Sequence, residues 1–164
     1  MSGHGRTLVA GVGNVFFGDD GFGVEVVRRL SEGPLPPGVR AADYGIRGVH
    51  LAYELLDRAY ETVVLVDATP RGGTPGTVYL IEPDLESLGD SGPGAADAHG
   101  MSPELVFGLV RSLGGSLGRV LIVGVEPTPS EDEALGLSEP VEAAVGEAVA
   151  MIRGLIEPGV KVRP

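Results

Sequence analysis

Short apolar runs alternate with segments of helical period along the chain. The short apolar runs predict five strands, over residues 7–12, 39–44, 62–67, 76–81 and 119–125. Apolar positions spaced three and four apart predict helices over about 21–31, 50–59 and 103–113. A last helix is predicted between Ser138, as its N-cap, and Gly159, which ends it. This alternation is typical of an α/β domain, here a three-layer αβα sandwich around a mostly parallel five-stranded sheet.

Two of the predicted strands are apolar at every position in their centres. Val63–Val66 and Val120–Val123 have the pattern of strands buried on both faces, so we place both centrally, beside the first strand. The connection over 74–78 is too short for a crossover helix. The strand over 76–81 is therefore predicted to pair antiparallel with its predecessor, at one edge of the sheet. With 164 residues, the chain is expected to form a single domain over 1–164.

Composition and charge narrow the classes of partner. The chain has 12 Lys and Arg against 23 Asp and Glu, a net charge of −11, which repels nucleic acids and anionic membrane surfaces. No apolar stretch reaches the roughly 20 residues that span a bilayer. The absence of cysteine excludes disulfides, thiolate metal sites and thiol nucleophiles. We expect a cytoplasmic protein; the sequence does not indicate its oligomeric state.

A glycine-rich segment follows the first strand, from Gly11 to Gly23. Dinucleotide-binding folds carry G-x-G-x-x-G at this place, but here the third glycine comes too late, and Asp19 and Asp20 would repel a pyrophosphate. A nucleotide site is therefore disfavoured. One of the two aspartates can instead cap the following helix, and both suit the dipole of that helix. The alternative is that one of them belongs to a site.

Further polar residues follow the predicted strands. Asp67 ends a buried strand, and His99 lies just before the third helix. Because ligands of open α/β sheets bind outside the carboxyl ends of the strands, Asp20, Asp67 and His99 can converge there. Two carboxylates and one imidazole suit a borderline divalent ion such as nickel or zinc. The alternatives are that Asp67 forms a turn and that His99 is merely solvated.

Several short motifs follow one another along the chain. They are Gly11-x-Gly13-Asn14 with Asp19-Asp20-Gly21-x-Gly23, Asp43-x-Gly45-x-x-Gly48-x-x-Leu51, Val66-Asp67-Ala68, Asp97-Ala98-His99, Gly124-Val125-Glu126-Pro127 and Gly136-Leu137-Ser138 before the last helix. Taken in this order, they resemble the hydrogenase maturation proteases. The resemblance covers nearly the whole chain, and the ordered set is far more specific than any single motif.

The resemblance implies an endopeptidase that removes the C-terminal extension of a [NiFe] hydrogenase large-subunit precursor after nickel insertion. The positions that match the family's metal-contacting residues are Asp20, Asp67 and His99, where some relatives have Glu in place of Asp20. We expect them to bind nickel carried by the substrate rather than a resident cofactor. They are also the expected catalytic residues, in a mechanism assisted by acid, as in an aspartyl protease, or by metal. The alternative is a non-catalytic nickel-sensing module, similar to a chaperone, that binds the precursor without cutting it.

Asp43 is the fourth expected catalytic residue, because it matches a turn beside the family's site. This chain departs from the family's Asp-Gly-Gly-Thr-like pattern there, with Tyr44, Ile46 and Arg47. Asp43 can equally cap a turn after the second strand. Glu126, after the fifth strand, can support the site from behind, although a solvated Glu is the default expectation.

Overall fold

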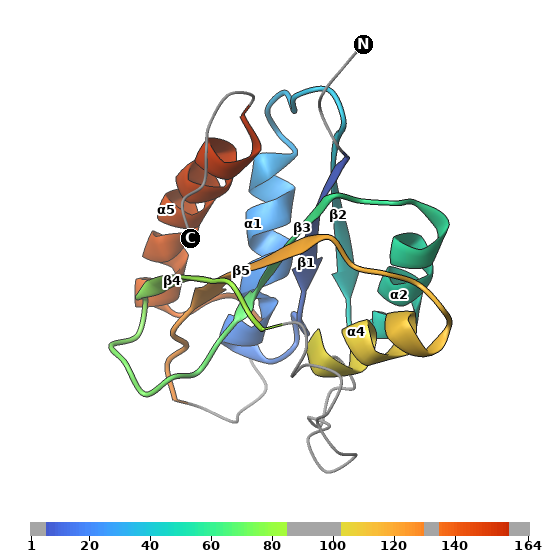
Figure 1. Cartoon of the computed structure of the whole chain (residues 1–164). Coiled ribbons are helices and arrows are strands. Elements are labelled where there is room, and N and C mark those ends of the chain that lie inside the picture. The colour runs from blue at the N-terminus through green and yellow to red at the C-terminus, as the bar shows by residue number, and fades with distance from the viewer. Residues whose placement is uncertain (1–5, 85–102, 130–134, 158–164) are drawn as a thin grey trace.

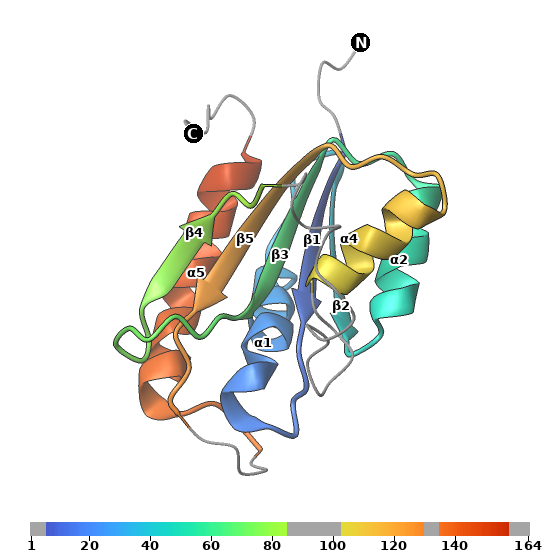
Figure 2. The same ribbon diagram turned by 60° about the horizontal axis from the view of Figure 1, so that its bottom comes forward.

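The computed structural model describes residues 6–84, 103–129 and 135–157, shown in Figures 1 and 2. It contains five strands, one 3-10 helix and four α-helices within these ranges. In chain order they are β1 (Thr7–Val12), η1 (Gly18–Gly21), α1 (Phe22–Leu30), β2 (Val39–Gly45), α2 (Gly48–Asp57), β3 (Thr62–Ala68), β4 (Val78–Ile81), α4 (Pro103–Ser112), β5 (Arg119–Val125) and α5 (Glu139–Ile156). All the predicted strands and helices are present, with ends shifted by a few residues. The stop predicted at Gly159 lies outside the described residues.

The strands form one sheet in the order β2-β1-β3-β5-β4. Four of them are parallel, and β4 is an antiparallel edge strand, as predicted. Two details of the prediction are wrong. The antiparallel partner of β4 is β5, not its predecessor β3, and β5 is separated from β1 by β3. The reason is that β3 pairs along both of its sides, with β1 and β5, so the returning chain reaches only the outer edge of β5.

Helices cover both faces of the sheet and give the predicted three layers. In Figure 2, α1 and α5 lie behind the sheet while α2 and α4 lie in front of it. Alternate residues of β3 supply the two cores, because successive side chains of a strand point to opposite faces. Val64 and Val66 pack with α1 and α5, whereas Val63 and Leu65 pack with α2 and α4.

The contact between the end of β1 and the start of α1 is too close for side chains. A Cβ atom at Gly23, the second residue of α1, would overlap the carbonyl oxygen of Val66 in β3 and lie 2.6 Å from that of Val12. A Cβ at Gly11 would in turn overlap the carbonyl oxygen of Gly23. Helix α1 therefore packs directly on the backbones of β1 and β3, which fixes the position of the turn before it.

We predict that Gly23→Ala destabilises the fold, whereas Gly146→Ala does not. The new methyl at Gly23 meets backbone atoms that have no room to move, and overpacking of this kind costs about 1–3 kcal/mol or more. Gly146 lies exposed inside α5, and a Cβ there meets nothing within 4 Å. Its replacement is expected to stabilise by roughly 0.5–1 kcal/mol. Urea unfolding of both variants checks this, and equal midpoints would contradict the close contact.

Candidate functional site

Three of the predicted site residues lie along one edge of the sheet. Asp43 is near the end of β2, Asp67 is near the end of β3, and Asp20 lies in η1, shortly after β1. Because β1, β2 and β3 are parallel and adjacent, their carboxyl ends meet at the same edge. This is the edge of an open α/β sheet where ligands bind.

Gly13 is the point where these segments meet. Its N–H donates a hydrogen bond of 2.9 Å to the carbonyl of Gly45 at the end of β2. A Cβ at Gly13 would overlap the carbonyl oxygen of Asp20 and lie 3.6 Å from Oδ1 of Asp67. Gly13 also has φ of +130°, a conformation that other residues rarely adopt. Because Gly13 has no side chain, the Asp67 carboxylate lies close to the segment that carries Asp20.

The carboxylates of Asp20 and Asp67 are held by backbone amides. Asp20 Oδ2 accepts a hydrogen bond of 2.7 Å from the N–H of Asn14, and Asp67 Oδ1 accepts one of 2.8 Å from the N–H of Ala68. Both aspartates are half-buried, so they are fixed in place and still reach the surface. Carboxylates arranged in this way can bind a cation or carry a proton.

The other two predicted site residues are Asp43 and His99. Asp43 is exposed, and its Oδ1 would lie 3.7 Å from a Cβ at Gly45, beside the Gly13 contact. His99 lies outside the described residues, so the predicted set of Asp20, Asp67 and His99 is not tested. Within the part of the chain that the structure describes, no three His, Asp or Glu side chains are grouped so that they can hold a metal ion.

Asp19 has a different role from its neighbour Asp20. It is 8% exposed, and its carboxylate accepts hydrogen bonds from the N–H of Thr128 (2.8 Å) and from the N–H (2.7 Å) and hydroxyl (2.8 Å) of Ser138. The interpretation of Asp19 or Asp20 as the cap of α1 is wrong, because the N-cap is Gly21, without a side-chain bond. Asp19 instead joins η1 to the start of α5, and the hydroxyl of Ser138 is engaged there rather than in capping.

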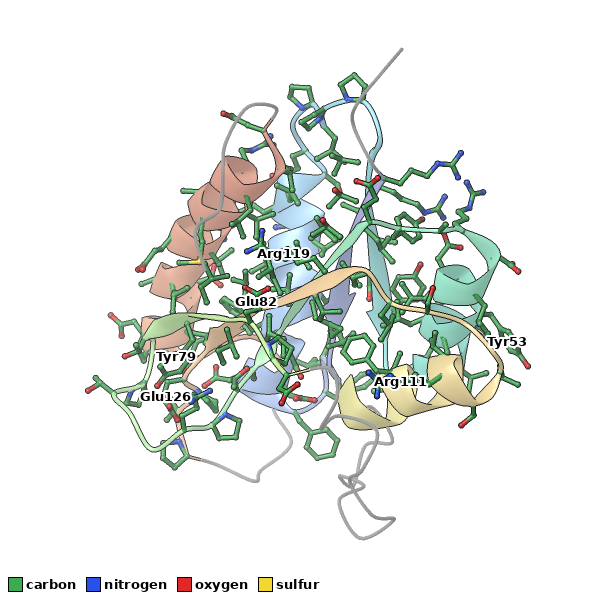
Figure 3. All side chains as sticks on the ribbon, viewed as in Figure 1. Tyr53, Tyr79, Glu82, Arg111, Arg119 and Glu126 are labelled. Atoms are coloured by element: carbon green, nitrogen blue, oxygen red, sulfur yellow. The ribbon has the colours of Figure 1, made fainter. Side chains whose placement is uncertain are left out.

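Glu126 is buried, so the expectation of a solvated Glu is wrong. It is 4% exposed, and its carboxylate accepts hydrogen bonds from the N–H groups of Arg71 (2.9 Å) and Gly73 (3.0 Å) and from the hydroxyl of Tyr79 (2.6 Å). Figure 3 shows Glu126 and Tyr79 lying together beside the β3–β4 connection. The carboxylate therefore holds the segment that follows Asp67 and Ala68. The position of Glu126 directly after a buried strand is the feature of the sequence that could have indicated this structural role.

The hydrogen bonds at Glu126 shift two pKa values. The Tyr79 hydroxyl, together with the backbone N–H groups, holds the pKa of Glu126 below its usual range, against the opposing effect of desolvation. The same hydrogen bond raises the pKa of Tyr79. Each shift favours the state that forms the bond, an ionised Glu126 and a neutral Tyr79.

The fold and the sequence both match proteins of one family. The model of the hydrogenase maturation protease family matches residues 24–154. This chain belongs to the hydrogenase maturation protease family. The hydrogenase expression/formation protein HupM of Azotobacter chroococcum is 33% identical over 159 residues, which cover 96% of this chain and 75% of HupM.

Solved structures of hydrogenase maturation peptidases have the same fold as this family member. A hydrogenase 2 maturation peptidase from a Thaumarchaeota archaeon is 34% identical, covers 95% of this chain and 99% of its own, and superposes with a TM-score of 0.69. The hydrogenase maturating endopeptidase HybD of Escherichia coli is 27% identical over 90% of this chain and 89% of its own, with a TM-score of 0.72. Within the described residues, no helix is both long and apolar enough to cross a membrane.

We predict that Glu126 stabilises the fold of this maturation protease at neutral pH and that this stabilisation is lost at acid pH. Because the folded-state pKa is lowered, the contribution is complete above the unfolded value of about 4.3 and is lost as the pH falls through the folded value. Wild type is therefore expected to melt at a higher temperature than Glu126→Gln at pH 7. The difference in melting temperature is expected to shrink below about pH 4.3. A difference that stays constant down to the acid limit would contradict this assignment.

Proposed function

We propose that this protein is the endopeptidase that removes the C-terminal extension of a [NiFe] hydrogenase large-subunit precursor after nickel insertion. Membership of the maturation protease family supports a peptidase that acts in hydrogenase processing. The single observation that carries the site assignment is the placement of Asp20 and Asp67 beside the turn at Gly13 and Asn14, at the carboxyl edge of the sheet. A protein substrate can approach this edge because both carboxylates are partly exposed.

Nickel enters this proposal as part of the substrate. Carboxylate oxygens and an imidazole are suitable ligands for a borderline divalent ion. We assign Asp20, Asp67 and His99 to contact the nickel of the loaded precursor, which makes the metal a recognition element. Precursor without nickel lacks this anchor, so its C-terminal extension is not held in place for cleavage.

Positioning supplies a large share of a hydrolytic rate, because a bound peptide bond meets its attacking water in a fixed geometry. Hydrolysis adds the hydroxyl of water to the scissile carbonyl carbon and a proton to the departing amine. A carboxylate within hydrogen-bonding reach can carry that proton. We assign this role to Asp43. It lies on β2, the strand that pairs with β1, and it is exposed beside the Gly13–Gly45 contact.

We predict that Asp20→Asn and Asp67→Asn each lower the rate of precursor processing by roughly a hundredfold or more, and Asp43→Asn by a similar factor. The first two variants lose a charged contact to the substrate, whereas the third loses a proton carrier. Asp57→Asn is the matched control, since it removes an exposed carboxylate at the end of α2, outside the proposed site. Electrophoresis of nickel-loaded precursor, incubated with each variant, gives the rates.

Unfolding curves accompany the assay, so that loss of activity is separated from loss of fold. Processing by Asp67→Asn at the rate of Asp57→Asn would contradict the site assignment. If wild type shifts the precursor on a native gel but never shortens it, the non-catalytic nickel-sensing module is the correct reading instead.

A further inference from the structure

A second concave site lies at the other end of the sheet, where β2 begins. It is a pocket of about 550 Å³ around the edge of β2, and it is lined mainly by Arg6, Leu35, Val39, Arg40, Arg58 and Tyr60. Val39 is the first residue of β2, whereas Asp43 of the proposed peptidase site lies near the end of that strand. The two sites therefore lie toward opposite ends of β2.

Three arginines meet in this pocket, although the chain has only 12 Lys and Arg and a net charge of −11. In the described part of the chain, Glu54 is the one carboxylate that forms an ion pair with them. It lies 3.3 Å from Nε of Arg58 and 3.9 Å from Nε of Arg40. Its carboxylate also accepts the hydroxyl of Tyr60 at 2.6 Å. Three positive charges against one negative charge leave the pocket cationic.

The positively charged side chains are more exposed to solvent than the carboxylate that pairs with them. The Glu54 side chain is 18% exposed, whereas the side chains of Arg40 and Arg58 are 55% and 51% exposed. The carboxylate thus lies beneath the guanidinium groups and holds them from below. The exposed guanidinium groups are available to form charge-assisted hydrogen bonds with a ligand carboxylate.

The backbone of β2 adds a second element of recognition. Among the described strands, β2 pairs only with β1, so its outer side is an open sheet edge. Open edges bind extended peptides as an added strand, with main-chain hydrogen bonds for affinity and side-chain contacts for specificity. Arg47 occupies the far end of this edge, where its guanidinium donates to the carbonyls of Asp43 and Tyr44. The arginine pocket spans the near end.

We propose that this pocket binds an extended acidic peptide segment of a protein partner, which adds to the edge of β2 and places its carboxylates on Arg6, Arg40 and Arg58. The charge of the pocket is complementary to acidic side chains, and the open edge of β2 favours a peptide over a small free anion. The proposal goes beyond the peptidase function and does not depend on it, since the two sites lie at opposite ends of β2.

The test is fluorescence anisotropy of a labelled peptide of alternating Glu and Val, titrated with the full-length protein. The double variant Arg6→Gln/Arg40→Gln is expected to weaken binding by roughly tenfold or more. This double variant leaves the ion pair between Arg58 and Glu54 in place. Arg71→Gln/Arg111→Gln is the matched control, because it removes two exposed positive charges outside the pocket and is expected to bind as wild type does.

Two further probes separate the parts of the proposal. The same peptide with Gln in place of Glu is expected not to bind, and inorganic phosphate at equal concentration is expected not to compete. Equal binding by the pocket variant and the control variant would overturn the proposal. Full competition by phosphate would also overturn it, in favour of a site for free oxyanions.

Discussion

The close backbone contact between the end of β1, the start of α1 and β3 is the constraint on which the proposed site depends. Gly11 and Gly23 allow α1 to rest on the strands without intervening side chains, and Gly13 lets the turn before η1 pass beside Asp67. As a result, Asp20 and Asp67 come from separate segments and still lie at one edge. Any side chain at these glycines would push the turn away from β3 and separate the two carboxylates.

The acidic residues near this edge divide into two groups by burial. Asp19 and Glu126 are buried, and each accepts several hydrogen bonds from residues that are distant in the sequence, so the role of both carboxylates is structural. Buried carboxylates are tolerated only when their oxygens are satisfied in this way. Asp20, Asp67 and Asp43 are partly or fully exposed. The buried group holds the loops that frame the edge, while the exposed group is available to a substrate.

The fold could be predicted because each buried strand is a continuous apolar run and each helix keeps one apolar stripe. The partner of β4 could not, because it depends on both sides of β3 being occupied, which is a property of the whole sheet. Glycine spacing and the strand ends placed Asp20 and Asp67 correctly at one edge. The roles of Asp19 and Glu126 depend on contacts to residues 119 and 55 positions away, and no local pattern reports such contacts.

In the proposed function, nickel carried by the precursor is the cationic partner of the carboxylates at this edge, and it makes their recognition of the precursor selective. The most direct measurement is mass spectrometry of a hydrogenase large-subunit precursor, nickel-loaded and nickel-free, after incubation with this protein. Loss of a C-terminal peptide from the loaded form alone is the predicted result. Equal cleavage of both forms would contradict nickel recognition, and the absence of cleavage with nickel-dependent binding would contradict the peptidase assignment.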